Sequence, residues 1–246
     1  MPEQNLSDSQ NPNAGLLLIG DELLSGRTQD VNFPSIAKFL AARGIDLCEV
    51  RVVSDVESDI IAAVNALRER YTYVFTTGGI GPTHDDITAD AIAKAFGVEI
   101  EQHPQAVEML HKLFKANGVE PNDARMRMAR VPQGGDLINS DKIKVPGFHI
   151  GNVFVMAGVP KIMNLMLEAV SDMIEGGPVV MSKSVRIERG EGDLAVPLAD
   201  IQNRFPDISI GSYPFHEKGC YGANIVLRGR NENDLESAFK EVETLV

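Results

Sequence analysis

A short apolar segment that runs directly into a glycine-rich loop is the feature that most constrains the fold of this chain. Tyr73-Val74-Phe75 is typical of a buried strand, and a helix is predicted to begin near Ala89. The loop between them reads Thr76-Thr77-Gly78-Gly79-Ile80-Gly81-Pro82-Thr83-His84-Asp85-Asp86. Strand–loop–helix units of this kind build α/β folds, in which ligands bind at the carboxyl ends of the strands.

Apolar strands and helical segments alternate along residues 14–176. We predict strands at 15–19, 46–53, 73–75 and 153–156, and helices at 34–43, 89–96, 104–116, 122–130 and 160–175. The segment Ser54-Asp55-Val56-Glu57 has capping-box spacing and predicts a further helix that runs to about Arg70. Thr88 or Asp86 is the expected N-cap of the helix at 89–96. Residues 131–151 are expected to be loop-rich. The alternation predicts a three-layer α/β/α domain with a mostly parallel sheet.

A second, smaller unit is predicted beyond the segment Glu175-Gly176-Gly177-Pro178, which has the composition of a linker. Residues 179–246 show strands and helices in β-α-β-β-α order, which indicates a compact α+β module. At the other end, residues 1–13 are expected to form a disordered tail. The chain is therefore expected to hold a tail, a main domain at 14–176 and a small module at 179–246.

Composition limits the partners that this chain can have. The 246 residues carry a net charge of −12, whereas a nucleic-acid-binding protein presents a basic surface. No apolar run approaches the roughly 20 residues needed to span a bilayer, and the first dozen residues lack the features of a signal peptide. Cys48 and Cys220 have no metal-ligand spacing. We expect a cytoplasmic protein whose partner is a small phosphorylated molecule, with no nucleic-acid or membrane partner.

The glycine-rich loop has the composition of an anion-binding site. Gly78, Gly79 and Gly81 allow backbone amides to approach a ligand with no Cβ in the way, and the following helix directs its positive end at the same place. Hydroxyl groups that can add hydrogen bonds belong to Thr76, Thr77, Thr83 and Thr88. No lysine follows the glycines, so the loop is not a Walker A motif, and it does not match GxGxxG either.

Asp85 and Asp86 require an explanation, because carboxylates repel a phosphate. In one interpretation Asp86 caps the following helix and Asp85 is solvated. In the other a divalent cation, Mg²⁺ or Co²⁺, lies between the carboxylates and the phosphate, as hard oxygen ligands favour. Both interpretations remain open at the level of sequence.

The loop resembles the TGGxGPTxDDxT signature of the molybdopterin-binding MoaB/MogA-like superfamily, and in particular the amino-terminal region of the competence/damage-inducible protein A (CinA) family. The related domain of eukaryotic FAD synthases is also similar. Further segments resemble family motifs in the same order: Ile19-Gly20-Asp21-Glu22-Leu23-Leu24-Ser25-Gly26, Val145-Pro146-Gly147-Phe148, Ala157-Gly158-Val159-Pro160 and Gly211-Ser212-Tyr213-Pro214. The resemblance covers about residues 14–246. It implies no amidase activity, because the family's amidase domain lies outside this region.

The resemblance implies a site. Asp85 and Asp86 match the family's metal-binding and catalytic carboxylates, which would hold a divalent cation across a pyrophosphate. Proteins close to CinA hydrolyse ADP-ribose or related nucleotide diphosphates such as FAD, and molybdopterin is the ligand of the wider superfamily. The positions expected to contact the ligand, besides Thr76, Thr77, Gly78, Gly79, Gly81, Pro82, Thr83 and Thr88 of the loop region, are Gly20, Asp21, Glu22, Asn139, Pro146, Gly147 and Gly158.

Two functions therefore stay open: a metal-dependent pyrophosphatase, and a molybdopterin-binding protein without turnover. Ile162 stands where the family usually carries an acidic residue, which favours the second. The resemblance also implies a homo-oligomer, a dimer or a trimer. Several cations could contact a phosphate or simply be solvated: Arg27, Arg125, Arg127, Arg130, Lys142 and Lys144.

Overall fold

The computed structural model describes residues 11–217 and 219–246, and these form two compact units, with the boundary along the chain between Gly177 and Pro178. The sequence predicts a disordered tail at residues 1–13. Residues 1–10 of this segment lie outside the described residues. Asn13 already belongs to the first strand, where it pairs with Asp46. Each unit has its own hydrophobic core and is described separately.

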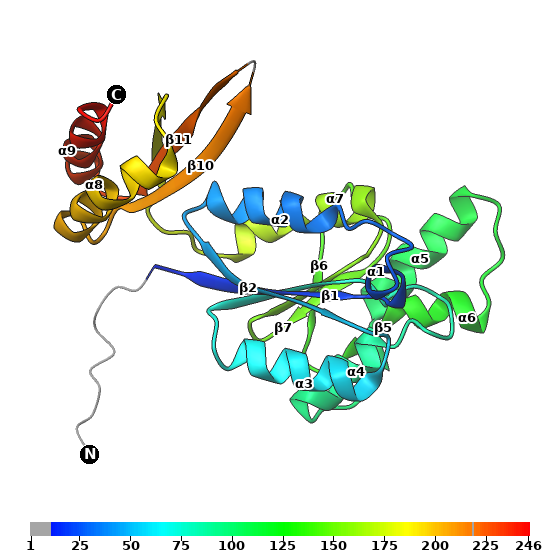
Figure 1. The fold of residues 1–246 in the computed structure, drawn as a ribbon. Coiled ribbons are helices and arrows are strands. Elements are labelled where there is room, and N and C mark those ends of the chain that lie inside the picture. The colour runs from blue at the N-terminus through cyan, green and yellow to red at the C-terminus, as the bar shows by residue number, and fades with distance from the viewer. Residues whose placement is uncertain (1–10, 218) are drawn as a thin grey trace. The chain divides into compact units, whose positions relative to one another are not determined.

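The first unit is built on a six-stranded sheet with the strand order β2-β1-β3-β8-β7-β6 (Figure 1). The strands are β1 (Asn13–Ile19), β2 (Asp46–Val53), β3 (Tyr73–Thr77), β6 (Asp136–Ile138), β7 (Gly147–Ile150) and β8 (Val153–Met156). The pairs β2–β1, β1–β3 and β3–β8 are parallel, and β8–β7 and β7–β6 are antiparallel. The mostly parallel sheet is confirmed, whereas β6 and β7 occupy the segment that was expected to be loop.

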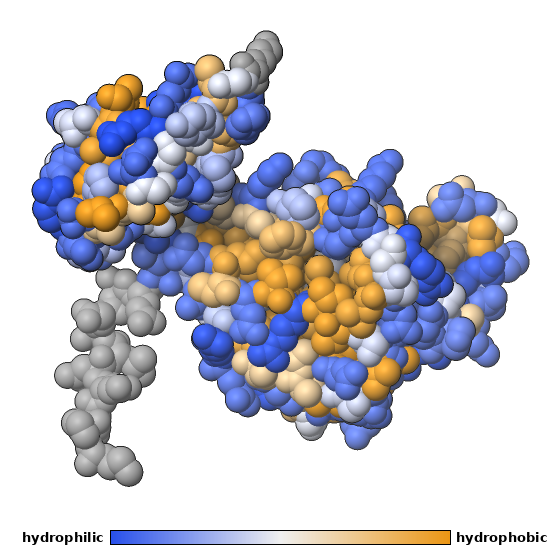
Figure 2. Space-filling model, viewed as in Figure 1, coloured by the Kyte–Doolittle hydropathy of each residue, from blue (hydrophilic) through white to orange (hydrophobic). Residues whose placement is uncertain are grey.

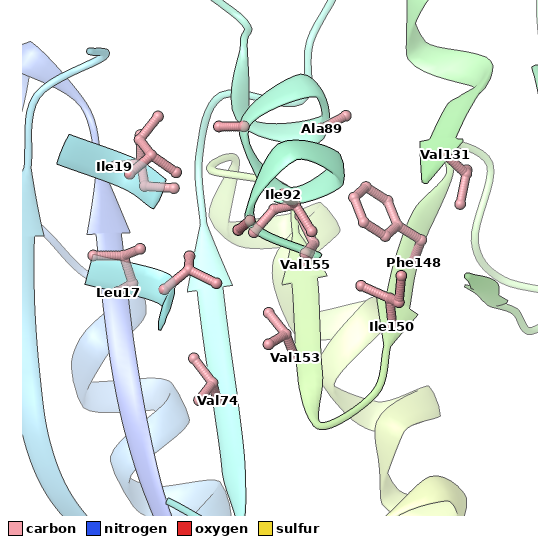
Figure 3. Close-up of a cluster of buried hydrophobic side chains, with 14 of the residues drawn as sticks. Leu17, Ile19, Val74, Ala89, Ile92, Val131, Phe148, Ile150, Val153 and Val155 are labelled. Carbon is pink, nitrogen blue, oxygen red and sulfur yellow. The ribbon is translucent and has the colours of Figure 1, made fainter. Parts of the chain in front are cut away.

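Helices cover both faces of this sheet and complete three layers, as predicted. On one face α2 (Asn32–Ala41) and α7 (Pro160–Val170) pack against Leu16, Leu18 and Phe75. On the other face α3 (Glu57–Arg68), α4 (Thr88–Phe96) and α5 (Pro104–Ala116) enclose a core to which Leu17, Val74, Ile92 and Val155 contribute (Figure 3). Because side chains of a strand alternate between faces, β1 supplies Leu16 and Leu18 to one core and Leu17 to the other.

The remaining elements of the first unit are short. They are α1 (Asp21–Leu24), α6 (Asp123–Met126), η1 (Arg127–Ala129), η2 (Ser171–Met173) and the antiparallel pair β4 (Ile100–Gln102) and β5 (Arg130–Pro132). The predicted capping box is wrong: Val56 is the N-cap of α3, and the Ser54 hydroxyl donates instead to Asp59 at 3.1 Å.

The second unit is an antiparallel sheet with the order β10-β11-β9 and two helices. Its elements are β9 (Met181–Ile187), α8 (Glu191–Arg204), β10 (Ser209–Glu217), β11 (Cys220–Gly229) and α9 (Glu232–Glu243). The buried side chains of Ile187, Leu194, Ile225 and Leu235 meet in its core. This is the small α+β module with the predicted β-α-β-β-α order.

Within the part of the chain that the structure describes, no helix is both long enough and apolar enough to cross a bilayer. Cys48 and Cys220 are free and exposed. Figure 2 shows that apolar residues gather on the face of the first unit where β2 forms the edge of the sheet, between α2 and α3 as Figure 1 draws them.

Candidate functional site

One pocket of about 470 Å³ opens where β1, β3 and β8 end. This is the carboxyl edge of the parallel strands, the place at which open α/β sheets bind ligands. Most of the residues that line it come from the ends of these strands and the segments that follow them, and Asp55, Met128 and Val145 come from elsewhere in the first unit. The lining residues are Ile19, Gly20, Glu22, Asp55, Gly78, Gly79, Ile80, Gly81, Pro82, Asp85, Asp86, Met128, Val145, Ala157, Gly158, Val159 and Ile162.

The glycine-rich loop is held tightly by its neighbours in the chain. A Cβ on Gly78 would lie 2.2 Å from the Ile19 carbonyl oxygen, and one on Gly79 would lie 2.1 Å from Thr88 Oγ1. Both glycines also have positive φ, 105° and 67°, which other residues rarely adopt. Thr88, fully buried, donates from its hydroxyl to the Gly78 carbonyl oxygen at 3.0 Å. The glycines therefore serve the packing of the loop as well as access to the pocket.

Asp86 accepts hydrogen bonds from another residue of its own loop. Its Oδ2 accepts hydrogen bonds from the Thr83 amide, at 2.8 Å, and from the Thr83 hydroxyl. A Cβ on Gly81 would lie 2.6 Å from the same oxygen, so glycine is required for the carboxylate to approach. The expected capping role is wrong for both candidates, because Ile87 occupies the N-cap of α4 while Asp86 bonds to Thr83 and Thr88 to Gly78.

Asp85 is the more accessible carboxylate of the pair, with a side chain 60% exposed. The neighbouring Thr83 hydroxyl lowers the pKa of Asp85 below its ordinary value, and its own backbone amide and His84 lower it further. Asp85 is therefore ionised at neutral pH. Nδ1 of the almost fully exposed His84 lies 3.8 Å from Asp85 Oδ1.

Asp55 lies at the same pocket and was missed by the sequence reasoning. It follows β2, the strand next to β1, and its Oδ2 accepts a hydrogen bond of 3.0 Å from the Asp21 amide. Burial raises the pKa of Asp55; the Asp21 amide opposes this, and the negative charges of Asp21, Glu22 and Asp85 add to it. Its position two residues after the end of a strand predicted for a parallel sheet is the sequence signal that points to Asp55.

Part of the wall is apolar. Ile19, Ile80, Met128, Val145, Ala157, Val159 and Ile162 contribute to it. Val159 is 56% exposed although it is apolar, and it comes directly before α7. A pocket with an apolar wall and a carboxylate-rich rim suits a ligand that has both a planar ring and a charged group.

Many, but not all, of the ligand-binding positions expected from the sequence line this pocket. Those that do are Gly20, Glu22, Gly78, Gly79, Gly81, Pro82, Asp85, Asp86 and Gly158. The others lie elsewhere: Asp21, Thr76, Thr77, Thr83, Thr88, Asn139, Pro146 and Gly147.

The positions that do not line the pocket have other surroundings in the structure. Thr76, Thr77 and Thr88 are buried, and Asn139 is exposed just after β6. A Cβ on Gly147 would lie 2.8 Å from Met166 Sδ, so that glycine allows β7 to pack against α7. Pro146 is buried beside a cavity of only about 10 Å³. The amides of Thr83 and Asp21 donate hydrogen bonds to the pocket residues Asp86 and Asp55, respectively.

The arginine and lysine side chains that the sequence offers as phosphate contacts form hydrogen bonds with other groups of the chain. Arg127 donates to the Asp86 carbonyl oxygen at 3.3 Å. Arg130 forms a bidentate salt bridge with Asp90, with hydrogen bonds of 2.9 and 2.7 Å. The rest bond to neighbouring groups: Arg27 to Ser25, Arg125 to Glu120, Lys142 to Glu168 and Lys144 to Asp141. Among the described residues, no lysine or arginine lines the pocket.

The donor set of the pocket fits a hard divalent cation. Glu22, Asp55, Asp85 and Asp86 supply oxygen ligands to one space with no cation of the protein on its wall, as far as the chain is described. Within the same residues, no three acidic, histidine or cysteine side chains are close enough to hold a metal together. A divalent cation here would therefore have at most two of these carboxylates as ligands and would need further oxygens from water or a substrate phosphate.

Comparison with known proteins finds a family match for each of the two units. Residues 15–176 match the family described as "Probable molybdopterin binding domain", and residues 179–246 match "FAD synthase, middle domain". A CinA-like protein of Myxococcus xanthus is 32% identical over 241 residues, covering 93% of this chain and 57% of its own length. A "Probable FAD synthase" of Caenorhabditis elegans is 27% identical over 261 residues, covering 96% of this chain and 50% of its own.

Among solved structures, CinA of Thermoplasma acidophilum aligns with a TM-score of 0.60 and 31% identity, covering 67% of this chain and 99% of that one. The chain thus spans about half the length of the Myxococcus and Caenorhabditis relatives. The family match covers most of the chain, including every residue of the pocket. The chain belongs to the molybdopterin-binding domain family of the MoaB and MogA type, with CinA-like proteins among its relatives.

Proposed function

We propose that the pocket binds the diphosphate of a nucleotide such as ADP-ribose or FAD together with a divalent cation, and hydrolyses it. The observation that carries this proposal is the charge of the wall: Glu22, Asp55, Asp85 and Asp86 line it, and no described lysine or arginine does. A phosphate enters such a space only with a cation between it and the carboxylates. The ligand of this pocket is therefore a metal complex of a phosphorylated molecule.

The two aspartates of the loop have different roles in this proposal. Asp85, ionised and exposed, is the side chain best placed to hold the cation, with Asp86 beside it. Asp86 also fixes the loop through Thr83, which keeps both carboxylates in place before the ligand arrives. When bound, the cation would withdraw charge from a phosphoryl oxygen and make a coordinated water more acidic. The loop residues Gly78–Gly81 also line the pocket.

The nucleotide as substrate class rests on two supports. The apolar wall formed by Ile19, Ile80 and Ile162, among others, gives a purine or flavin ring a place to pack beside the charged rim. The second unit matches the middle domain of FAD synthases, and relatives named as FAD synthases align over nearly the whole chain. A soluble nucleotide substrate and the acidic composition are the basis for proposing a cytoplasmic location.

The test is release of AMP from ADP-ribose and from FAD by the purified chain, with Mg²⁺ or Co²⁺ and with chelator. We expect metal-dependent release that the double variant Asp85→Ala/Asp86→Ala loses. The matched control is His84→Ala, which removes an exposed side chain of the same loop and keeps both carboxylates. Equal rates in the wild type and the double variant would exclude hydrolysis at this site.

The second candidate is a molybdopterin-binding protein without turnover, and Ile162 is the observation that favours it. Ile162 lines the pocket, where an acidic side chain would add to the metal ligands. A pterin bound in the cell would be retained on native purification and detected by its fluorescence. In this case Ile162→Glu is expected to gain AMP release that the wild type lacks, whereas under the first proposal the wild type already releases AMP.

A further inference from the structure

Arg127 lies beside the glycine-rich loop without lining the candidate pocket. It lines a separate small cavity of about 10 Å³. Several residues line both this cavity and the pocket: Gly79, Ile80, Gly81, Asp86 and Met128. The Arg127 side chain and the ligand space therefore share wall residues, and one of these is a carboxylate of the loop.

The segment that carries Arg127 is tied to the starts of α4 and α5. Arg130 forms its bidentate salt bridge with Asp90 of α4, and the two side chains are 24% and 25% exposed. The amide of His103, directly before α5, donates to the Ala129 carbonyl oxygen at 2.9 Å. Arg127 begins η1, so these two ties fix its backbone beside the loop.

The Arg127 guanidinium holds the backbone of Asp86. Its Nη2 donates to the Asp86 carbonyl oxygen at 3.3 Å, and no other group in the described part of the chain donates to that oxygen. Carboxylate Oδ2 of Asp86 accepts from the Thr83 amide and hydroxyl. Arg127 and Thr83 thus hold one oxygen of Asp86 each. The remaining oxygen, Oδ1, accepts no hydrogen bond from the described residues and is available for a cation.

The hydrogen bonds of Arg127 itself are incomplete. Its Nε is buried and has no hydrogen-bond partner among the residues that the structure describes. A buried N–H group without a partner destabilises a fold, whereas an unbranched apolar side chain such as methionine would fill the same space without an unpaired donor. The stability of the fold therefore does not explain an arginine at this position. What arginine adds is a charged donor to the Asp86 carbonyl oxygen.

We propose that Arg127 is a positioning residue, which keeps the loop at Asp86 in one conformation so that Asp86 Oδ1 stays in place for a divalent cation. Arg127 acts through Asp86 and does not touch the ligand, since it does not line the pocket. Its effect on the cation rests on the proposed function. Its effect on the loop does not, because the hydrogen bond to Asp86 forms without any ligand.

Hydrogen exchange of the metal-free full chain, followed by NMR, tests the effect on the loop. We expect the Thr83 amide, which donates to Asp86, to exchange about tenfold faster in Arg127→Met than in the wild type, and the amides of β1 to keep their rates. The control is Arg125→Met, which removes an arginine of the same segment that bonds to Glu120 and should leave the loop unchanged. Unchanged exchange at Thr83 in Arg127→Met, or an equal increase in β1, overturns the proposal.

Binding of Mn²⁺ without nucleotide, followed by electron paramagnetic resonance, tests the effect on the cation; Mn²⁺ prefers oxygen ligands as Mg²⁺ does. Removal of a positive charge near carboxylates would by itself strengthen cation binding. Loss of the position of Asp86 acts in the opposite direction. We expect the Kd of Mn²⁺ to rise by about tenfold in Arg127→Met and to change little in Arg125→Met. A Kd that falls or stays equal in Arg127→Met overturns the effect on the cation.

The two experiments separate this inference from the proposed function. A wild type that neither binds Mn²⁺ nor releases AMP excludes the proposed function, and faster exchange at Thr83 in Arg127→Met would still show that Arg127 orders the loop. A wild type that releases AMP, together with unchanged exchange and unchanged Mn²⁺ binding in Arg127→Met, overturns the inference and leaves the proposed function standing.

Discussion

At the scale of single residues, the glycines of the loop do more than the sequence indicated. The sequence suggested that they bring backbone amides close to a ligand. The structure shows that Gly78, Gly79 and Gly81 each face an atom of this chain at 2.2, 2.1 and 2.6 Å from where a Cβ would lie. The loop is therefore a packed structure with one shape. Its shape places Asp85 and Asp86 at the pocket before any ligand is present.

The change Gly81→Ala tests whether that shape matters for binding. The added methyl group lies 2.6 Å from Asp86 Oδ2, so the carboxylate has to move and its bonds to Thr83 weaken. We expect the Kd of a metal–ADP-ribose complex, measured by calorimetry, to rise by about tenfold or more, which is about 1.4 kcal/mol. Gly192→Ala, where the methyl group meets open space on α8, is the control and should bind as the wild type does. Unchanged affinity in Gly81→Ala would mean that Asp86 is not needed in its observed place.

Asp55 gives a prediction about pH. Its pKa is raised by burial and by Asp21, Glu22 and Asp85, so its ionisation opposes folding. A raised carboxyl pKa contributes stability that is present at low pH and is lost as the pH rises through the folded value. Asp55→Asn keeps an oxygen that can accept from the Asp21 amide and removes the charge. We expect this variant, in chelator, to melt a few degrees higher than the wild type at pH 7.

The advantage of Asp55→Asn should shrink as the pH falls towards the ordinary aspartate value of 3.8, where the wild-type carboxyl is protonated as well. Thermal melts at several pH values measure it. Added Mg²⁺ should reduce the difference at pH 7 by stabilising the wild type more. A variant that melts lower than the wild type at pH 7 would show that Asp55 stabilises the apo fold through its charge.

At the scale of elements, α4 and the loop are joined by Thr88. This residue is fully buried at the first turn of α4; its hydroxyl donates to the Gly78 carbonyl oxygen, and its amide donates to the Gly79 carbonyl oxygen, each at 3.0 Å. The sequence suggested Thr88 as a helix cap or a ligand contact. Its observed role is to hold the start of the helix against the turn of the loop, which orients the segment that carries Asp85 and Asp86.

Replacing Thr88 with valine keeps its shape and removes the hydroxyl. The Gly78 carbonyl oxygen then loses a buried hydrogen bond, which costs about 1–3 kcal/mol of the free energy of unfolding. Urea denaturation measures this loss, and Thr88→Ser, which keeps the hydroxyl, should recover most of it. If the valine variant were as stable as the wild type, the Gly78 carbonyl would have to find another donor.

The strands and helices that sequence predicts well are those with a strong apolar pattern. β1, β3 and β8 are continuous apolar runs, and each was predicted within a few residues of its bounds. The short strands β6 and β7 were missed, because three or four residues among glycine and proline carry no periodicity that distinguishes a strand from a loop. Their pairing depends on contact with β8, which only the folded chain provides.

The candidate site, like the fold, could be predicted from the sequence only in part. The pocket-lining residues Gly78, Gly79, Gly81, Asp85 and Asp86 could be named from sequence because one local motif contains them. Asp55 was missed because it lies far along the chain from that motif and reaches the pocket only when β2 pairs with β1. The motif around Gly147 does not reveal that Met166 lies where a Cβ would be, since a motif does not show which neighbour requires the missing side chain.

At the scale of the whole molecule, the two units have separate cores. Residues of β1, β3 and β8 build two cores in the first unit, and Ile187, Ile225 and Leu235 belong to a third core composed only of residues of the second. All residues that line the candidate pocket come from the first unit. The stability of the pocket should therefore depend on the first two cores and not on the third.

Ile225→Ala tests this independence. Ile225 is fully buried, and such truncations cost about 2–5 kcal/mol, a large fraction of the stability of a unit as small as residues 178–246. Hydrogen exchange should speed up in β9, β10 and β11 and stay unchanged in β1, β3 and β8. Binding of the metal–nucleotide complex should also stay unchanged. If exchange increased equally in both units and binding were lost, the units would unfold together, and the second unit would be required to maintain the pocket.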